Sequence, residues 1–295
     1  MSVCAVVVTF NRRDLLEECL AALAAQTRPP EHLLVVDNAS TDGTPELVRD
    51  RYAGRVELVA LPTNEGGAGG FHEGLRRAHE AGHEWIWLMD DDTIPTPTAL
   101  AELLAAPART GLDHPPALLS SKVVWTDGKL HPMNQPGFER ERVPDVVAGC
   151  EQHLMPLRAT TFVSLLVHRG AVDRHGLPLA RYFLWSDDIE YTARILGREP
   201  GYLVPASVAV HKTALAYTAI SASSGDRFYF HARNTLYMLR SPAWALREKP
   251  GIVFSYVMSI LEYLRVNRYA RRNVMVVLRG MRDGLKPGAP VPARP

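Results

Sequence analysis

The first hundred residues alternate between short apolar runs and segments in which hydrophobic residues recur with helical spacing. The apolar runs predict buried strands, and the periodic segments predict amphipathic helices. The predicted strands are residues 3–8, 33–36, 56–60 and 84–89. The predicted helices are residues 11–25, 45–52 and 69–81. Strands that alternate with helices form a parallel sheet covered on both faces, so we expect an α/β fold.

The pattern becomes less regular after about residue 115. Further strands are predicted over residues 117–125, 160–168 and 202–210. A loop-rich stretch covers residues 126–156, and a helix ends at Gly197. Residues 226–282 have a helical pattern and many arginines. These changes predict four parts, which are residues 1–115, 116–225, 226–285 and a disordered tail over 286–295.

Polar residues directly follow three of the predicted strands. They are Thr9 to Asn11, Asp37 with Asn38, and Asp90 to Asp92. The carboxyl ends of parallel strands lie at one edge of a sheet, and ligands bind outside that edge. We therefore expect these three groups to converge on one site.

Three consecutive aspartates, Asp90 to Asp92, follow the apolar run that starts at Trp85. Three carboxylates repel one another unless a positive charge lies among them, and Mg²⁺-type ions bind carboxylates together with substrate phosphates. Side chains alternate along an extended chain, so Asp90 and Asp92 face one way and Asp91 the other. The alternative is a solvated acidic strand end, or a helix N-terminus that Thr93 and Pro95 open.

The glycine-rich segment Asn64–Gly70 precedes a predicted helix. Glycines let a backbone approach a ligand closely, and helix N-termini favour anions. The segment lacks the Lys-Ser/Thr ending of a P-loop and follows the third strand, so it is a poor dinucleotide motif. A flexible loop is the alternative interpretation.

Two more features have a possible chemical role. Asp187 and Asp188 form a second acidic pair, in which crowding raises one pKa and favours a general base. Ser186 as the cap of the following helix is the simpler interpretation. His211 ends a predicted strand, where it is either structural or a third metal ligand.

Composition narrows the function classes. The chain has 33 Lys+Arg and 32 Asp+Glu, a net charge of +1, which does not indicate nucleic-acid binding. Its apolar N-terminal run lacks a preceding basic region and no apolar stretch reaches 18 residues, so we expect a cytoplasmic protein. The basic residues after Glu262 fit either an anionic membrane surface or the solvated face of a packed helix. An oligomer stays open.

Six segments occur in the order and spacing of inverting glycosyltransferases of family 2. They are Val6–Arg12, Val35–Thr44, Asn64–Gly70, Trp87–Asp92, Trp185–Glu190 and His211. Over roughly residues 1–212 the chain resembles this family, which implies a GT-A fold. This fold is a Rossmann-like, mixed and mostly parallel sheet flanked by helices, here with a C-terminal helical segment. Residues 1–115 would bind the nucleotide sugar, and residues 116–225 the acceptor.

Within the family, the chain is similar to actinobacterial galactofuranosyltransferases of cell-wall galactan assembly. Arg227–Asn234 is similar to an aromatic-rich segment of the same enzymes. Rhamnosyltransferases share much of the pattern. The resemblance therefore implies transfer of galactofuranose or rhamnose from a UDP-sugar or dTDP-sugar to a hydroxyl of a glycan or glycolipid.

The resemblance also implies site residues. The donor-binding set is Thr9, Phe10, Asn11, Asp37, Asn64, Gly67, Gly69, Gly70, Asp90, Asp91 and Arg233. In this set Thr9, Asp37 and Asn64 would hold the base and ribose. Arg233 would contact the leaving diphosphate.

The catalytic part of the site is implied in the same way. Asp90, Asp92 and His211 would hold Mn²⁺ or Mg²⁺ at the donor diphosphate. Asp188 would deprotonate the acceptor in a single inverting displacement, Asp187 would orient either Asp188 or the acceptor, and Trp185 would stack on the acceptor sugar. Many family members have Glu-Asp where this chain has Asp187-Asp188, which leaves the role of Asp187 open.

Two other functions remain to be weighed. A nucleotidyltransferase would need a glycine-rich loop with a basic residue after the first strand, and Thr9 to Arg13 lacks the glycines. A catalytically silent protein could keep the sugar-nucleotide site. The presence of Asp90, Asp92, Asp188 and His211 argues against that function. Contact of the basic segment with the inner face of the cell membrane stays open beside the solvated face of a packed helix. We expect one or a few sugar additions instead of processive synthesis.

Overall fold

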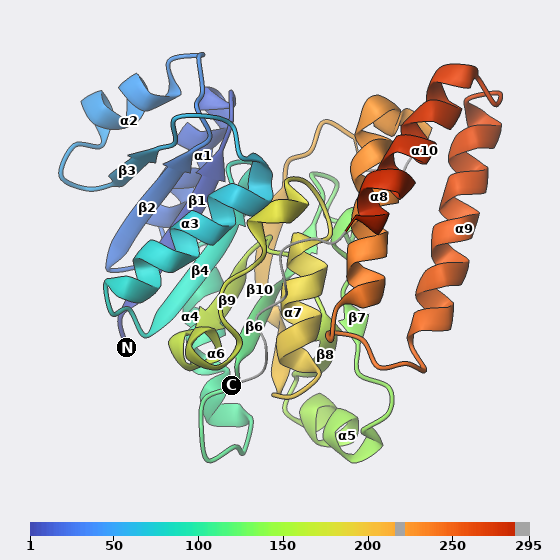
Figure 1. Ribbon diagram of the computed structural model, residues 1–295. Coiled ribbons are helices and arrows are strands. Elements are labelled where there is room, and N and C mark those ends of the chain that lie inside the picture. Colours follow the sequence, from blue (N-terminus) through green and yellow to red (C-terminus); the bar gives the residue numbers. More distant parts are fainter. Residues whose placement is uncertain (216–221, 287–295) are drawn as a thin grey trace.

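The computed structural model describes residues 1–215 and 222–286. Within these ranges one ten-stranded sheet has helices against both faces (Figure 1). The strands are β1 (Val3–Thr9), β2 (His32–Asp37), β3 (Glu57–Ala60), β4 (Trp85–Asp90), β5 (Thr93–Pro95), β6 (Leu118–Val124), β7 (Gly137–Phe138), β8 (Met155–Ala159), β9 (Leu165–His168) and β10 (Gly201–His211). The helices are α1 (Arg13–Ala24), α2 (Thr44–Arg51), α3 (Gly66–Glu80), α4 (Ala99–Ala105), α5 (Val143–Glu151), α6 (Arg169–His175), α7 (Asp187–Leu196), α8 (Phe228–Arg240), α9 (Lys249–Val266) and α10 (Arg271–Leu285).

The strand order is β3-β2-β1-β4-β9-β6-β10-β8-β7, and β5 pairs with β10. β1 to β4 are parallel, as the alternation of strands and helices predicts. β9 runs antiparallel between β4 and β6, and β10 is parallel to β6. Most strands therefore point the same way, and the expected mixed, mostly parallel sheet is confirmed.

Several elements differ from the sequence-based prediction. Of the strand predicted over 160–168, only residues 165–168 form a strand, β9, because the chain turns before it, where Ser164 has a positive φ of 55°. The strand β8 precedes this turn and ends at Ala159. β8 pairs with β10, whereas β9 lies between β4 and β6. Thr93 and Pro95 form β5 and do not open a helix. The helices α4, α5 and α6 were not predicted.

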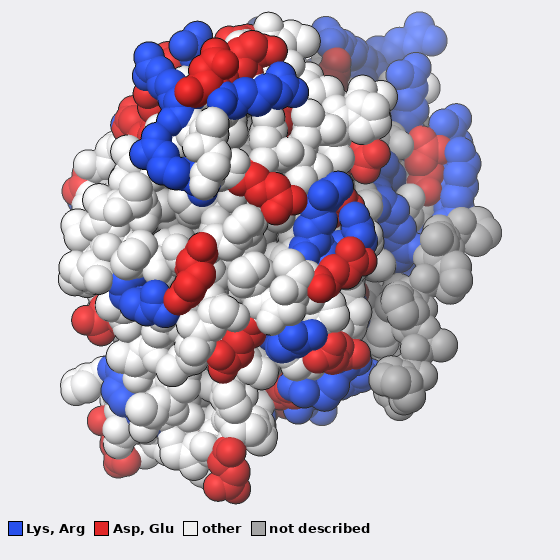
Figure 2. Space-filling view, turned by 90° about the vertical axis from the view of Figure 1, so that its left-hand side faces the viewer, with Lys and Arg blue, Asp and Glu red and all other residues white. Residues whose placement is uncertain are grey.

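Charged side chains of both signs share the face of the molecule on the side of α2 (Figure 2). Many form pairs there, such as Arg49 with Glu46 and Arg77 with Glu57, each at 3.6 Å. This mixture agrees with the near-zero net charge of the chain. The described residues include no helix with both the length and the hydropathy of a membrane span.

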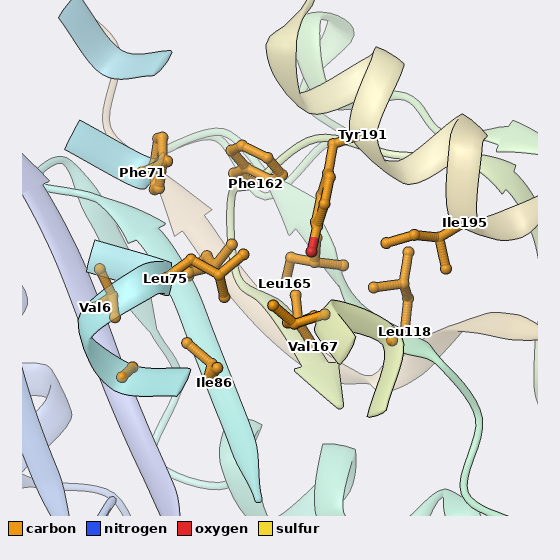
Figure 3. Close-up of a cluster of buried hydrophobic side chains, with 14 of the residues drawn as sticks. Val6, Phe71, Leu75, Ile86, Leu118, Phe162, Leu165, Val167, Tyr191 and Ile195 are labelled. Carbon is orange, nitrogen blue, oxygen red and sulfur yellow. The ribbon is translucent and has the colours of Figure 1, made fainter. Parts of the chain in front are cut away.

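The core lies on both faces of the sheet because β1 is buried on both sides. Val6 and Val8 face α3, and Val3 and Val7 face α1. Figure 3 shows the first of these layers, where strand side chains meet α3 and α7. A central strand with no solvated face has a continuous run of apolar residues, so β1 could be predicted from the sequence.

Helix α3 packs closely against β1 because glycines face the strand. A Cβ on Gly74 would lie 2.3 Å from Val6 Cγ1, and one on Gly70 would lie 2.5 Å from Val8 Cγ1. Real Cβ atoms do not approach other atoms so closely. The glycines of this segment therefore bring the N-terminus of α3 against the end of β1, where the polar strand ends lie.

Candidate active site

The polar strand ends meet at a cavity of about 460 Å³ between the sheet and α7. Seven of the predicted site residues line it, namely Gly67, Asp90, Asp92, Trp185, Asp187, Asp188 and His211. The sequence therefore located seven of the 22 lining residues, including all four aspartates of the lining, although they come from segments far apart in the chain. The other predicted residues lie around this cavity, outside its lining.

The three aspartates at the end of β4 divide as alternation predicts. Asp91 turns toward the end of β1, where it accepts hydrogen bonds from Thr9 Oγ1 at 2.8 Å and from the Phe10 N–H at 3.3 Å. Asp90 and Asp92 line the cavity instead. Arg12 pairs with both Asp91 and Asp92. Asp91 thus connects two strand ends, whereas Asp90 and the Oδ1 atom of Asp92, whose Oδ2 pairs with Arg12, face the cavity.

Asp90, Asp92 and His211 offer ligand atoms that all lie within 4.8 Å of one another. His211 ends β10, which β5 brings beside the turn after β4. Two carboxylate oxygens and an imidazole nitrogen form a donor set that Mn²⁺ accepts readily. Asp92 Oδ1 is buried and has no aligned hydrogen-bond donor among the described residues. The residues present therefore fit a divalent cation.

The orientation of His211 supports this fit. Its Nδ1 lies 2.7 Å from Asn134 Oδ1, and Asn134 Nδ2 donates to Thr161 Oγ1 at 3.0 Å. An amide oxygen only accepts, so Nδ1 carries the proton and Nε2 has a lone pair in the neutral ring. Nε2 lies 3.0 Å from Asp92 Oδ1, which also has lone pairs. Either a proton on Nε2 or a cation between the two atoms stabilises this arrangement.

The cavity concentrates negative charge. Burial and the charges of Asp92 and Asp91 raise the pKa of Asp90 well above its usual range. Burial also raises the pKa of Asp91 to about 6, although Arg12 opposes this shift. Burial opposes ionisation of Asp92 as well, but His211 and Arg12 lower its pKa overall. One arginine compensates these charges only in part, and a divalent cation would complete the compensation.

Asp187 and Asp188 begin α7 on another wall of the cavity. Burial raises the pKa of Asp188 to about 6, and burial with the charge of Asp188 raises that of Asp187 further. A carboxylate with a pKa near neutrality is suited to general-base catalysis. Ser186 occupies the N-cap position, as the simpler interpretation of this segment expects, but its side chain makes no capping hydrogen bond.

The loop before α7 has an unusual backbone. Phe183, Trp185 and Ser186 all have positive φ, between 63° and 69°, which L-residues adopt at a cost of about 1–3 kcal/mol each. Such strain persists only where surrounding contacts fix it. It also turns Trp185 and the two aspartates toward the cavity.

Two side chains of α8 fix this strained loop. Asn234 Nδ2 lies 2.8–3.0 Å from the carbonyl oxygens of Tyr182, Leu184 and Trp185. Arg233 Nη2 donates to the carbonyls of Tyr182 at 2.6 Å and Arg181 at 3.1 Å. The Arg233 guanidinium also lies over aromatic rings of α8. Arg233, predicted at the diphosphate, thus contacts the loop, while Arg12 and Arg227 line the cavity.

The glycine-rich segment touches the same loop. Gly66 has a φ of 72°, and a Cβ there would lie 2.0 Å from the carbonyl oxygen of Phe183. The Ala68 N–H donates to that oxygen at 3.2 Å. Gly67 lines the cavity, whereas Gly69 faces Glu65. The segment therefore joins the predicted donor half to the loop that carries Asp188.

The remaining predicted residues connect the ends of β1 and β2. Asp37 accepts from the Ser40 N–H at 3.0 Å through Oδ2, while its buried Oδ1 has no donor among the described residues. The Asn11 N–H donates to Ser40 Oγ at 2.8 Å. Asn64 Oδ1 accepts from the Gly66 N–H at 2.8 Å, and Phe10 is 42% exposed. Asp37 therefore keeps one oxygen free for a ligand.

Four residues of this site were missed by the sequence analysis. They are Arg12, Asn134, Arg227 and Asn234. Arg12 belongs to the first quoted segment, so its position after a strand was an available signal. Asn134 lies in a loop and Asn234 in a helix, and neither pattern indicates a neighbour 77 or 52 residues away.

The mixed sheet with acidic strand ends defines a GT-A architecture, and the comparisons with known proteins agree. The sequence model "Glycosyl transferase family 2" matches residues 4–115. Galactofuranosyltransferase GlfT1 of Mycolicibacterium smegmatis is 30% identical over 92% of this chain and 96% of its own length. The chain belongs to glycosyltransferase family 2, and it is a glycosyltransferase. The resemblance noted in the sequence is confirmed.

Other relatives extend this finding. N-acetylglucosaminyl-diphospho-decaprenol L-rhamnosyltransferase of Mycobacterium tuberculosis is 29% identical over 71% of this chain and 75% of its own length. Among solved structures, S. aureus TarS has a TM-score of 0.61 at 17% identity, over 92% of this chain and 45% of that chain. A TarS fragment, residues 1–349, solved in complex with UDP, has a TM-score of 0.60 at 17% identity, with 91% and 74% covered. At this identity the TarS structures support the fold alone.

Proposed function

We propose that this glycosyltransferase moves galactofuranose or rhamnose from a UDP-sugar or dTDP-sugar to a hydroxyl of a glycan or glycolipid, with inversion. The observation that carries the proposal is the composition of one cavity. Asp90, Asp92 and His211 lie at one wall, and Asp188 lies at another. A sugar nucleotide whose diphosphate meets the first group would present its anomeric carbon toward the second.

The donor end of the site would use the strand ends. The free Asp37 Oδ1 would accept a hydrogen bond from the base or ribose, with Thr9 and Asn64 nearby. Asp90, Asp92 and His211 would hold Mn²⁺ or Mg²⁺, which neutralises charge on a departing diphosphate. Arg12 and Arg227, both in the cavity lining, would add positive charge there.

The transfer step would be a single displacement. Asp188 takes the proton of the acceptor hydroxyl, and the acceptor oxygen forms a bond to the anomeric carbon. The bond from that carbon to the diphosphate oxygen breaks, and the nucleoside diphosphate leaves with the electron pair. Asp187 would keep Asp188 oriented, and Trp185 would stack on the acceptor sugar. No covalent enzyme intermediate is needed, so the configuration inverts.

The relatives guide the choice of substrates. One is named as a galactofuranosyltransferase, and another as a rhamnosyltransferase whose acceptor carries a diphospho-decaprenol lipid. A lipid-linked acceptor would make contact of the basic C-terminal segment with an anionic membrane useful. The family membership favours a glycosyltransferase over the nucleotidyltransferase and the silent binding protein.

Calorimetric titration with UDP-galactofuranose, UDP-galactopyranose and dTDP-rhamnose tests the donor, each with Mn²⁺ and with a chelator. We expect one sugar nucleotide to bind in a metal-dependent way. The anomeric configuration of the product, determined by NMR, then tests inversion. Equal donor binding with and without the chelator would show that binding needs no metal. Retention of the anomeric configuration in the product would contradict the single displacement.

A further inference from the structure

Helix α9 exposes a row of apolar side chains. Val253, Phe254, Val257, Met258 and Leu261 are between 43% and 69% exposed. Positions 254, 258 and 261 follow helical spacing and share one face. The opposite face carries Tyr256 and Tyr263, which are buried. The helix is therefore apolar on two sides, and only one of them packs against the rest of the described chain.

Positive charge continues this row. Arg265 follows Leu261 by four residues in α9, so it lies on the same face. Arg268 lies just beyond the end of α9, in the turn that leads into α10, where its φ is 52°. Residues 249–286 contain eight basic and two acidic side chains. The basic ones are Lys249, Arg265, Arg268, Arg271, Arg272, Arg279, Arg282 and Lys286. This excess differs from the mixed charges on the α2 side (Figure 2).

The arginines of α10 contribute to this excess of positive charge. A hollow of about 710 Å³ lies beside this helix, lined by Arg271, Arg272 and Arg279 among others. Arg272 pairs with Asp226 at 2.6 Å, but Arg271 and Arg279 have no ion-pair partner among the described residues. The hollow is larger than the active-site cavity, yet the described residues form no cluster of potential metal ligands there. Its unpaired cations are suited to phosphate groups.

We propose that α9, with the turn that leads into α10, is a docking surface for an anionic phospholipid bilayer. An interfacial helix buries its apolar face near the acyl boundary and keeps its cations among the headgroups. Tyr269, in that turn, is 60% exposed, and tyrosine is enriched at this depth. A second copy is a poorer occupant, because a symmetric contact would place this cationic surface against itself.

The structure changes the surface that the sequence indicated. The apolar run over 274–278 lies on α10, but Val277 is only 4% exposed and packs in a cluster with Phe228 and Tyr263. Met275 and Leu278 of this run stay exposed, at 41% and 52%, but the longer row of exposed apolar side chains lies on α9. The arginines after Glu262 that belong to the described part of the chain are exposed, and Arg294 lies outside the described residues.

The docking surface is close to the catalytic loop. Tyr256 of α9 donates to the carbonyl of Ala232 at 2.8 Å, and Tyr263 stacks on Phe228 with ring centroids 3.9 Å apart. Both partners belong to α8, whose Asn234 fixes the loop before Asp188. The inference deepens the proposed function, because a docked enzyme would present its base to a lipid-linked acceptor.

Vesicle co-sedimentation of the full chain tests this inference without donor or acceptor. The probes are vesicles of phosphatidylcholine alone and vesicles with three parts in ten phosphatidylglycerol. We expect binding to the anionic vesicles only, and weaker binding as salt rises. The double variant Phe254→Ser, Met258→Ser and the double variant Arg265→Glu, Arg268→Glu should each lower the partition coefficient by about tenfold or more.

Matched controls come from other surfaces. Val143→Ser with Val147→Ser removes two apolar side chains of α5 that are 59% and 52% exposed. Arg140→Glu with Arg198→Glu reverses two exposed arginines that have no ion-pair partner among the described residues. We expect both controls to bind as the native chain does. Truncation is unsuitable, because it would remove Tyr263 and Val277 from a buried cluster.

The other outcomes overturn the inference. Equal binding to both vesicle types, or binding that the α9 variants leave unchanged, would exclude this surface. Light scattering that shows a dimer, which the Phe254→Ser, Met258→Ser variant converts to a monomer, would make a second copy the occupant. Because transfer to a water-soluble acceptor is measured separately, failure of docking and failure of the proposed function are distinguishable.

Discussion

The two walls of the active-site cavity are built in different ways. The wall at the sheet places its side chains through regular strands, so the end of β4 presents Asp90 to the cavity beside Thr9 and Asp37, which lie outside the lining at the ends of β1 and β2. The wall at Trp185 and Asp188 depends on an irregular loop with positive φ angles. In the first wall, hydrogen bonds within the sheet fix the positions of the side chains. The second depends on contacts from α8 and from Gly66.

This difference shows that the backbone strain lies in the loop before α7 and not at the strand ends. Regular strands need no special backbone to present a carboxylate, because alternation already does so. The wall at Trp185 and Asp188 holds three residues in an unfavourable conformation, with Asp187 buried and Asp188 half-buried beside it. We therefore expect substitutions that support the second wall to lower catalysis while donor binding at the first wall survives.

The largest expected effect comes from Asp188→Asn. Loss of a general base lowers turnover by about 10²–10⁴-fold. Donor binding in the presence of Mn²⁺ should stay within about twofold, because Asp188 is not among the clustered metal-ligand residues. Steady-state kinetics and calorimetry measure the two quantities, with Asp145→Asn on exposed α5 as the control. Near-normal turnover of Asp188→Asn would show that another group is the base.

Gly66→Ala tests the contact between the walls. The new Cβ would meet the Phe183 carbonyl at 2.0 Å and would also need a positive φ. We expect a loss of about 2 kcal/mol or more in the free energy of unfolding, together with lower turnover. Gly67→Ala is the matched control, since a Cβ there meets no atom within 4 Å. Similar melting temperatures for the two variants would contradict the close contact.

Asn234→Ala removes the main clamp of the loop. Three backbone carbonyls would lose their shared donor, at a cost of about 1–3 kcal/mol in stability. We expect turnover to fall by about tenfold or more, because misplacement of a catalytic group is costly, whereas KM for the donor changes little. Asn273→Ala on α10 removes one hydrogen bond, to Tyr263, and serves as the control. A rise in donor KM with unchanged turnover would place Asn234 on the donor side instead.

These two walls also explain what the sequence could reveal. Hydrophobic periodicity located β1, β2 and β4, and the positions of Asp37 and Asp90 at the strand ends identified them as candidate site residues. The glycine-rich segment was recognisable, but its contact with Phe183 was not, because that contact joins residues more than 100 positions apart. Neither periodicity nor composition encodes a positive φ at Trp185.

The same limit applies to the sheet as a whole. The parallel half has local crossovers, so strand and helix follow one another in the sequence. β9 inserts between β4 and β6 from a distant position, and the short β5 pairs with β10 across 114 residues at Pro95 and Ala209. Such pairings depend on tertiary packing more than on local propensity. The family resemblance supplied roles for Asp188 and His211 that pattern alone left open.

Asn134→Ala should weaken metal binding without donor present. The residue fixes the His211 ring through a 2.7 Å contact, and loss of such outer partners lowers metal affinity by about 10–100-fold. Electron paramagnetic resonance of free Mn²⁺ measures this affinity directly. Asn134→Asp keeps an acceptor for Nδ1, so it should restore most of the affinity. If both variants bound Mn²⁺ as the native protein does, Asn134 would have no part in orienting His211.

The smallest effect is a pH dependence. The pKa of Asp188 is raised to about 6 by burial, and a base acts only when deprotonated. The rate constant kcat/KM should therefore be level above about pH 7 and fall about tenfold per unit below the pKa.

The free energy of unfolding should change with pH in the opposite sense. A folded-state pKa above the usual 3.8 means that stability falls as pH rises from about 4 to 6, and Asp188→Asn should remove part of this decline. Urea unfolding of the native protein and of Asp188→Asn at pH 5 and pH 7.5 measures the free energy of unfolding of each. An equal change with pH in the two proteins would show that Asp188 ionises freely and that its charge does not destabilise this wall of the cavity.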